Sequence, residues 1–291
     1  MTLDGVPAAE LAARWGVPHC GLFRQLTSTL DAIHQLGLQG APAATTVIAE
    51  EQTAGRGRDG RTWHSPQGGV WLGVLFRPQH AVLGTIGIRA GLAVADTVDA
   101  LLGGPVARLK WPNDVLLDDR KLAGILCEGR WQGERLQWLA VGVGVNVRNA
   151  VPAAVARRAV ALEERLPDVR RLDVLDRLVP ALVGSATLDP ALSEQECAAF
   201  AARDWLRGPA PLPGSRSRRR AASRRRLACG PRGGDDRRAR GPCRARLTSR
   251  GAPASRSRCA SWAARRACHA WGWCGNSRVA RRCRSPPGCA P

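Results

Sequence analysis

The densest group of chemistry-bearing residues is the segment EEQTAGRGRDGRTW, residues 50–63, which follows an apolar run. Three glycines within six residues let backbone amides approach an anion closely. Three arginines in the same stretch supply forked donors that match carboxylate and phosphate groups. A loop of this kind would hold a negatively charged group while that group is activated. A solvated basic turn explains the same composition, and the segment lacks the G-K-[ST] ending of a P-loop.

A second candidate is the segment KWPND, residues 110–114. Lys110 is one of two lysines in the chain, the other being Lys121, and all the remaining long basic side chains are arginine. A retained lysine indicates a need for a compact ammonium in place of a planar fork. Asn113 and Asp114 offer oxygen atoms for hydrogen bonds or for Mg²⁺. The alternative is a plain turn, because Pro-Asn-Asp is common in turns.

Two further segments follow in the chain, KLAGIL at 121–126 and GVGVN at 142–146. The first is an ordinary amphipathic strand when taken alone. In the second, glycines alternate with valines, so one face of the strand carries no side chains. A flat ligand or a closely packed helix could occupy that face, and the residues alone do not choose between the two.

The elements that must position these segments alternate between strand and helix patterns. Ser28 and Thr29 precede an apolar helical spacing that is expected to stop at Gly37. Strands are predicted at 45–52, 68–78 and 135–147, and as a pair within 108–131 around a turn at 118–120. Helices are predicted within 1–20, ending at Gly16, at 84–104, and over most of 152–207, with a capping box at Ser193 and Glu196. The pattern predicts an α+β domain, a mixed β-sheet flanked by helices.

The net charge of +20 comes from one end of the chain. Residues 209–291 hold 22 of the 44 basic residues and two of the 24 acidic ones, so residues 1–208 are neutral. The same stretch contains three Leu, one Val, and neither Ile nor Phe. So few apolar side chains cannot offset chain entropy by burial. We therefore expect an Arg-rich, disordered tail without a packed core.

The sequence carries no membrane or export signal that we recognise. No run of about 18 apolar residues is present, and the first residues carry acids in place of an apolar signal core. The cysteines before residue 209 are Cys20, Cys127 and Cys197, and their spacing does not suit zinc. These features predict a cytoplasmic protein with reduced cysteines and no membrane partner.

Together, the four segments resemble the biotin–protein ligases. EEQTAGRGRDGRTW is similar to the biotin-binding loop of that family, and KWPND, KLAGIL and GVGVN follow in the family's order at similar spacing. Ser28-Thr29 before a helix matches a further element, although Leu30 stands where many relatives have Asn. The resemblance implies a catalytic domain of the class II synthetase-like fold at 22–208. Residues 1–21 would then be an N-terminal extension, and residues 209–291 would stand where the family has a small β-barrel.

The resemblance also implies roles for individual residues. The biotin-binding set would be Ser28, Thr29, Gln52, Arg56, Gly57, Arg58 and Lys110. The set that binds ATP or the adenylate would be Gly55, Trp63, Asn113 and Asn146. The catalytic set would be Lys110, Arg56 and Arg58, which would neutralise two anions that must meet. Mg²⁺ would enter with the ATP phosphates, and no side chain is assigned to it.

The implied reaction has two steps and uses ATP, biotin and Mg²⁺. The carboxylate of biotin attacks the α-phosphate of ATP, which forms biotinyl-5′-AMP, and a lysine of a biotin carboxyl carrier protein then attacks the anhydride. Some relatives carry an N-terminal helix-turn-helix, but residues 1–21 are too short for one, so specific DNA is not an expected partner. The resemblance leaves a homodimer open.

Two other functions fit parts of the sequence. A lipoate–protein ligase shares the fold class and chemistry of biotin–protein ligases, although GRGRDGR and KWPND favour biotin. A nucleic-acid-binding protein would use the Arg-rich tail, with an affinity that falls steeply with salt. The tail's composition is also what a GC-rich gene yields out of frame. We therefore expect a reading-frame shift near residue 209, with a genuine basic tail as the alternative.

Overall fold

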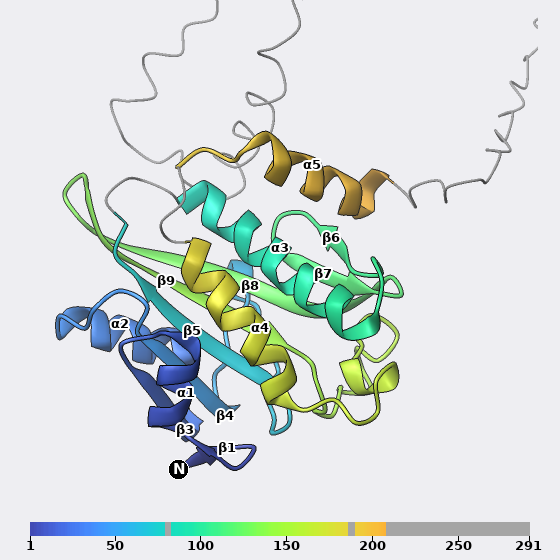
Figure 1. Cartoon of the computed structure of the whole chain (residues 1–291), viewed down its shortest axis with the longest axis horizontal. Helices are drawn as coiled ribbons and strands as arrows, with labels where there is room; N and C mark the ends of the chain where they lie inside the picture. Colours follow the sequence, from blue (N-terminus) through green and yellow to red (C-terminus); the bar gives the residue numbers. More distant parts are fainter. Residues whose placement is uncertain (79–82, 186–189, 208–291) are drawn as a thin grey trace, which may run out of the picture.

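A mixed seven-stranded sheet forms the centre of the protein, which we describe from a computed structural model for residues 1–78, 83–185 and 190–207 (Figure 1). The tail expected at 209–291, and the frame shift proposed for it, lie outside these residues. In spatial order the strands are β3 (Cys20–Leu26), β4 (Thr46–Gln52), β5 (Val70–Phe76), β9 (Arg135–Val145), β8 (Arg120–Gln132), β7 (Asp114–Leu117) and β6 (Arg108–Lys110). β3 and β4 run parallel, and the other neighbours are antiparallel.

Helices cover both faces of this sheet, as the α+β prediction required. They are α1 (Ala8–Trp15), α2 (Thr29–Leu38), α3 (Leu83–Leu102), α4 (Arg171–Gly184) and α5 (Glu194–Arg203). Figure 1 shows α3 and α4 lying across one face, with α5 stacked beyond α3. No helix among the described residues is long and apolar enough to cross a bilayer.

Alternation along β9 explains why the two faces differ. Val141 and Val143 point into the main core, which α3 and α4 complete. Trp138 points to the opposite face, where it packs in a second cluster with Leu30 and Ile33 of α2. Since successive strand residues face opposite sides, the glycines of GVGVN lie on the α2 face. That face carries the candidate site.

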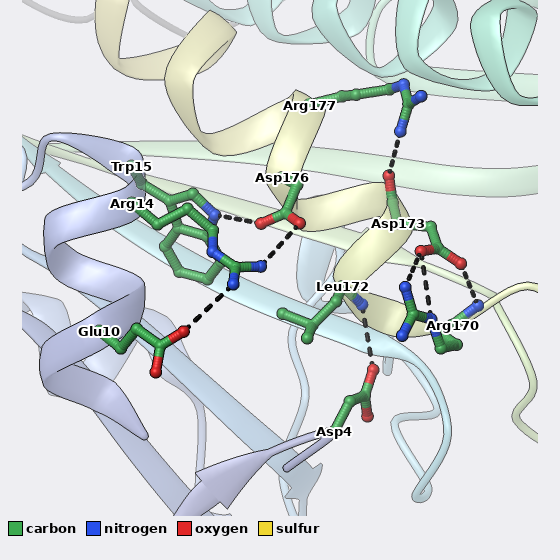
Figure 2. A network of polar contacts seen from close by, with 9 residues as sticks. All are labelled: Asp4, Glu10, Arg14, Trp15, Arg170, Leu172, Asp173, Asp176 and Arg177. Carbon is green, nitrogen blue, oxygen red and sulfur yellow. Dashed lines mark hydrogen bonds and ion pairs between the residues drawn. The ribbon is translucent and has the colours of Figure 1, made fainter. Parts of the chain in front are cut away.

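The N-terminal residues contain more than the single helix that the sequence predicts. β1 (Thr2–Leu3) and β2 (Val6–Pro7) form a short hairpin before α1, and α1 ends at Gly16 in the left-handed region, as expected. Figure 2 shows how this segment is fastened to α4: Trp15 Nε1 donates to Asp176 Oδ1 at 2.7 Å, and the Leu172 amide donates to Asp4 Oδ2 at 3.1 Å. The extension predicted at 1–21 therefore packs on the same body as the sheet, and its last residues begin the edge strand β3, which was not predicted.

Two other predictions about elements are wrong for physical reasons. Gly37 lies inside α2 and does not end it; a Cβ there would lie 2.6 Å from Trp138 Cε2, so the glycine allows close packing. Residues 151–170 form turns and the short 3₁₀ helix η2 (Leu162–Glu164), although most of 152–207 was predicted to be helical. The capping box of α5 and the turn between β7 and β8 are confirmed; in the turn, Asp118 and Asp119 have φ of 51° and 59°.

Candidate active site

The floor of the candidate site is a pair of glycines beneath an indole ring. Gly124 of β8 and Gly144 of β9 are directly paired across the two strands. A Cβ on Gly144 would lie 2.5 Å from Trp63 Nε1, and one on Gly124 would lie 3.1 Å from Trp63 Cζ3. The bare strand face predicted from GVGVN is thus covered twice, by Trp63 over Gly144 and by Leu30 of α2 over Gly142.

A cavity of about 280 Å³ opens beside Trp63, between the Gly/Arg loop (residues 55–63), the first turn of α2 and the β6–β7 hairpin. Nine of the eleven predicted site residues line it: Ser28, Thr29, Gln52, Arg56, Gly57, Arg58, Trp63, Lys110 and Asn113. Residues as far apart in the sequence as Ser28 and Gly144 therefore meet at one place. Gly55 and Asn146 do not line the cavity.

One end of the cavity is polar and uncharged. Gln52 Oε1 accepts hydrogen bonds from the Thr29 amide at 2.8 Å and from Thr29 Oγ1 at 3.1 Å. Gln52 Nε2 donates to Ser65 Oγ at 2.8 Å, so both ends of the amide are fixed. Ser28 caps α2, because its Oγ accepts from the Leu30 amide at 3.2 Å. This end can recognise a neutral polar ring by hydrogen bonds.

Basic side chains also line the cavity, and Arg56 is the one that is bound to two carboxylates. Arg56 NH1 lies 3.0 Å from Asp31 Oδ1, and NH2 lies 3.0 Å from Glu128 Oε2. Glu128 also bonds His34 Nε2 at 3.0 Å, and Trp138 Nε1 donates to His34 Nδ1 at 3.1 Å. An indole nitrogen can only donate, so His34 Nδ1 is the acceptor. His34 Nε2 therefore carries the hydrogen and donates it in the hydrogen bond to Glu128. The hydrogen bond from His34 and the charge of Arg56 hold the pKa of Glu128 below its usual value.

The Gly/Arg loop is bonded within itself as a small hairpin. The Trp63 amide donates to the Gly55 carbonyl at 2.9 Å, and the Gly57 amide donates to the Arg61 carbonyl at 2.7 Å. Asp59 has a φ of 60° and contacts both Arg58 and Arg61, each at 3.3 Å. These contacts within the loop give it a defined shape.

Both lysines of the chain line this cavity, and each rests on an indole ring. Lys110 Nζ is 4.9 Å from the ring centre of Trp205, and Lys121 Nζ is 4.9 Å from that of Trp63. Lys121 also forms an ion pair of 2.7 Å with Asp114 Oδ1. Such contacts fix the position of an ammonium while leaving it charged.

Comparison with known proteins agrees with this arrangement. The profile of the Biotin/lipoate A/B protein ligase family matches residues 22–146, which hold all four sequence segments and the cavity floor. Residues 22–146 belong to this family. Similar curated proteins include the Bifunctional ligase/repressor BirA of Bacillus spizizenii, 38% identical over 125 residues, and the Biotin--[acetyl-CoA-carboxylase] ligase of Paracoccus denitrificans, 45% identical over 118 residues.

Coverage of these relatives is partial. The matches take in 42% and 39% of this chain, and 38% and 49% of the two relatives, so the chain spans less than half the length of each. Among solved structures, the biotin protein ligase from Aquifex aeolicus in complex with biotin and ATP superposes with a TM-score of 0.54 at 27% identity. That superposition covers 65% of this chain and 79% of the other. The family fold is therefore present, and the predicted mixed sheet flanked by helices is confirmed.

For two residues that the family resemblance assigned to the nucleotide, contacts within the protein also explain the residue type. A Cβ at Gly55 would lie 2.4 Å from the Trp63 carbonyl, so the glycine allows two backbone segments to approach. Asn146 is buried, and its Oδ1 accepts from Asn149 Nδ2 at 3.1 Å. Their nucleotide roles stay predictions, and the geometry supplies an independent reason for both residue types.

Three charged residues that line the cavity were not among the eleven predicted site residues: Arg61, Asp114 and Lys121. Lys121 could have been found from its rarity, since the same argument singled out Lys110. Asp114 lies in a quoted segment, but the sequence could not show that it pairs with Lys121. Trp205 carried no signal at all, because nothing in its local sequence points to the cavity.

The oxygen atoms of Asp114 and Asn113 fit Mg²⁺ only when a bound ligand supplies further oxygen atoms. No group of three or more His, Cys, Asp or Glu side chains that could hold a metal is present in the part of the chain that the structure describes. Asp114 and Asn113 line the cavity, and Mg²⁺ commonly uses one or two protein oxygens together with phosphates and water. These residues suit an ion brought in with a phosphate chain.

Proposed function

We propose that this chain activates the carboxylate of biotin with ATP and transfers the biotinyl group to a lysine of a biotin carboxyl carrier protein. The observation that carries the proposal is the division of one cavity into a neutral hydrogen-bonding end and a cationic wall. Ser28, Thr29 and Gln52 would receive the ureido ring of biotin. Arg56, Arg58 and Lys110 would face the carboxylate and the phosphates. The catalytic domain would be residues 22–208.

The proposed chemistry needs positioning more than it needs a nucleophilic side chain. A carboxylate oxygen of biotin forms a bond to the α-phosphorus of ATP, and the bond to pyrophosphate breaks. The carrier amine then attacks the acyl carbon, AMP leaves, and the amine proton passes to solvent or a nearby base. Two anions must approach in the first step, so fixed positive charges lower its barrier. Mg²⁺ held by Asp114, Asn113 and the phosphates would supply further positive charge.

The site's surroundings support these assignments. Gln52 cannot rotate without losing bonds at both ends, and Arg56 is held by two carboxylates, so neither has to be ordered at the moment of binding. The similar structure from Aquifex aeolicus is described as holding biotin and ATP, which supports the same pair of ligands here. The free thiols of Cys20 and Cys127 agree with a proposed cytoplasmic location. A homodimer and the absence of specific DNA binding stay predictions.

The test is ATP–pyrophosphate exchange by the purified full chain, with biotin or lipoate as the acid. We expect exchange to depend on biotin and to be much slower with lipoate. A chain that supports exchange with lipoate and not with biotin would be a lipoate ligase. A folded chain that supports exchange with neither acid would overturn the proposed activity.

A further inference from the structure

Helix α5 is fastened to the domain by a buried ion pair. The Arg89 side chain, from α3, is 4% exposed, and its Nε lies 2.6 Å from Glu196 Oε1. Arg89 NH2 also donates to the Ala191 carbonyl at 2.9 Å, just before the helix. At the other end of α5, Arg203 NH2 lies 2.6 Å from Asp96 and 3.0 Å from Asp99. Both ends of α5 are therefore tied to α3.

The residues after α5 continue along the edge strand β6. Leu109 and Asp204 form a parallel bridge, and Arg108 NH2 donates to the Asp204 carbonyl at 3.0 Å. The short 3₁₀ helix η4 (Trp205–Arg207) follows directly. Since β6 ends at Lys110, this arrangement brings residue 205 beside the lysine.

Trp205 is held from two sides. Its Nε1 donates to Asp119 Oδ1, in the β7–β8 turn, at 2.7 Å. Its ring lies 4.9 Å from Lys110 Nζ. Trp111, the neighbour of Lys110, packs edge-on against Phe200 of α5 with ring centres 6.2 Å apart. The β6–β7 hairpin and the α5–η4 segment thus meet around the lysine.

We infer that Trp205 is a positioning residue for Lys110, and that the α5–η4 segment is part of the active site. The ring would hold the ammonium at the cavity by cation–π attraction without neutralising it, unlike a carboxylate. The purpose of this contact rests on the proposed function, since Lys110 needs to be held there only if it meets a substrate anion. The contact itself does not depend on that function.

The contact can be tested without any substrate. Reductive ¹³C-methylation of the full chain labels Lys110, Lys121 and the α-amino group, and methylation keeps the lysine charge. We expect both lysine methyl signals to be shifted by ring currents in the parent. Trp205→Leu should return the Lys110 signal to the free value, and Trp205→Phe should keep most of the shift. Leu206→Ala, in the same turn and 60% exposed, is the matched control and should change neither signal.

The positioning role is tested by the kinetics of the same variants. Trp205→Leu should lower kcat of biotin-dependent pyrophosphate exchange about two- to fivefold, with little change in the KM for biotin, and Trp205→Phe should restore most of it. An unshifted Lys110 signal in the parent would overturn the contact. Normal kcat in Trp205→Leu would overturn the positioning role. If the parent shows shifted signals and no exchange, the proposed function fails while the contact stands.

Discussion

At the scale of single residues, the two lysines differ in how much charge they leave for a ligand. Lys121 is paired with Asp114 at 2.7 Å, so much of its charge is already neutralised. Within the described part of the chain, no carboxylate lies within ion-pairing distance of Lys110, whose neighbour is the Trp205 ring. A ring attracts the ammonium without cancelling its net charge. Lys110 is therefore better suited to meet a substrate anion.

Replacing Lys110 should abolish most of the proposed activity. Lys110→Ala should reduce adenylate formation about a hundredfold or more, as for loss of a preorganised charge in an active site. Lys110→Arg should also fail substantially, because a planar fork cannot occupy the place of a compact ammonium. The measurement is biotin-dependent pyrophosphate exchange, with urea unfolding to confirm that each variant folds. Lys121→Arg, which can keep the ion pair with Asp114, should lose less activity than Lys110→Arg. Near-normal exchange in folded Lys110→Ala would remove this lysine from the mechanism.

At the scale of elements, the packing of α5 on α3 depends on the protonation of one carboxyl. The hydrogen bond from Arg89 lowers the pKa of Glu196 from 4.5 to about 2, and bonds from Ser193 act in the same direction. A carboxyl whose pKa is lower in the folded state stabilises the fold above its unfolded value of 4.5. That contribution is lost as the pH falls through about 2.

Glu196→Gln should therefore destabilise the protein in a pH-dependent way. At pH 7 we expect a loss of about 3 kcal/mol in the free energy of unfolding, because the pKa shift disappears and Arg89 loses its buried partner. The gap between parent and variant should narrow as the pH is lowered from about 4.5 towards 2. Urea unfolding at several pH values measures this, with Glu194→Gln, exposed in the same first turn, as control. A gap that does not change with pH would show that the ion pair contributes little.

The elements also show where prediction from sequence stops. The resemblance of short, ordered segments to a family predicted nine of the residues that line the cavity, because the residue types and spacing of such segments can be recognised locally. The strand β3 was missed, since CGLFRQL carries polar residues at an exposed edge and lacks strict alternation. Gly37 was taken for a helix end because its real reason, the Trp138 ring, lies about a hundred residues away. Trp205 depends on the packing of α5, which no local pattern reveals.

At the scale of the whole molecule, both ends of the described chain pack on the domain that holds the cavity. Residues 1–15 are fastened to α4 through Trp15 and Asp4, as Figure 2 shows. Residues 203–207 lie along β6. The composition of residues 209–291, with three Leu and one Val, supports the proposal that this stretch adds no core.

A chain that ends after Gly208 should therefore fold and work like the full chain. We expect the same free energy of unfolding in urea within about 0.5 kcal/mol, as for changes outside a packed core, and the same rate of pyrophosphate exchange. A second truncation, after Glu194, removes η4 and most of α5. This variant should lose both stability and pyrophosphate exchange. Loss of cooperative unfolding in the 1–208 chain would mean that the tail is structural. The nucleotide sequence read in another frame after codon 208 tests the frame-shift proposal separately.

The small number of lysines has a consequence for how far the protein would be acylated by its own product. An acyl adenylate acylates any free amine that it meets, so an enzyme that makes one is exposed to self-labelling. Apart from its α-amino group, this chain offers two amines, and each rests on an indole ring, one of them also bound to a carboxylate. Almost all other cations on the surface are guanidinium groups, which do not react. A composition that reflects the base content of a gene would thus leave few positions at which the reagent that we propose the protein makes could label it.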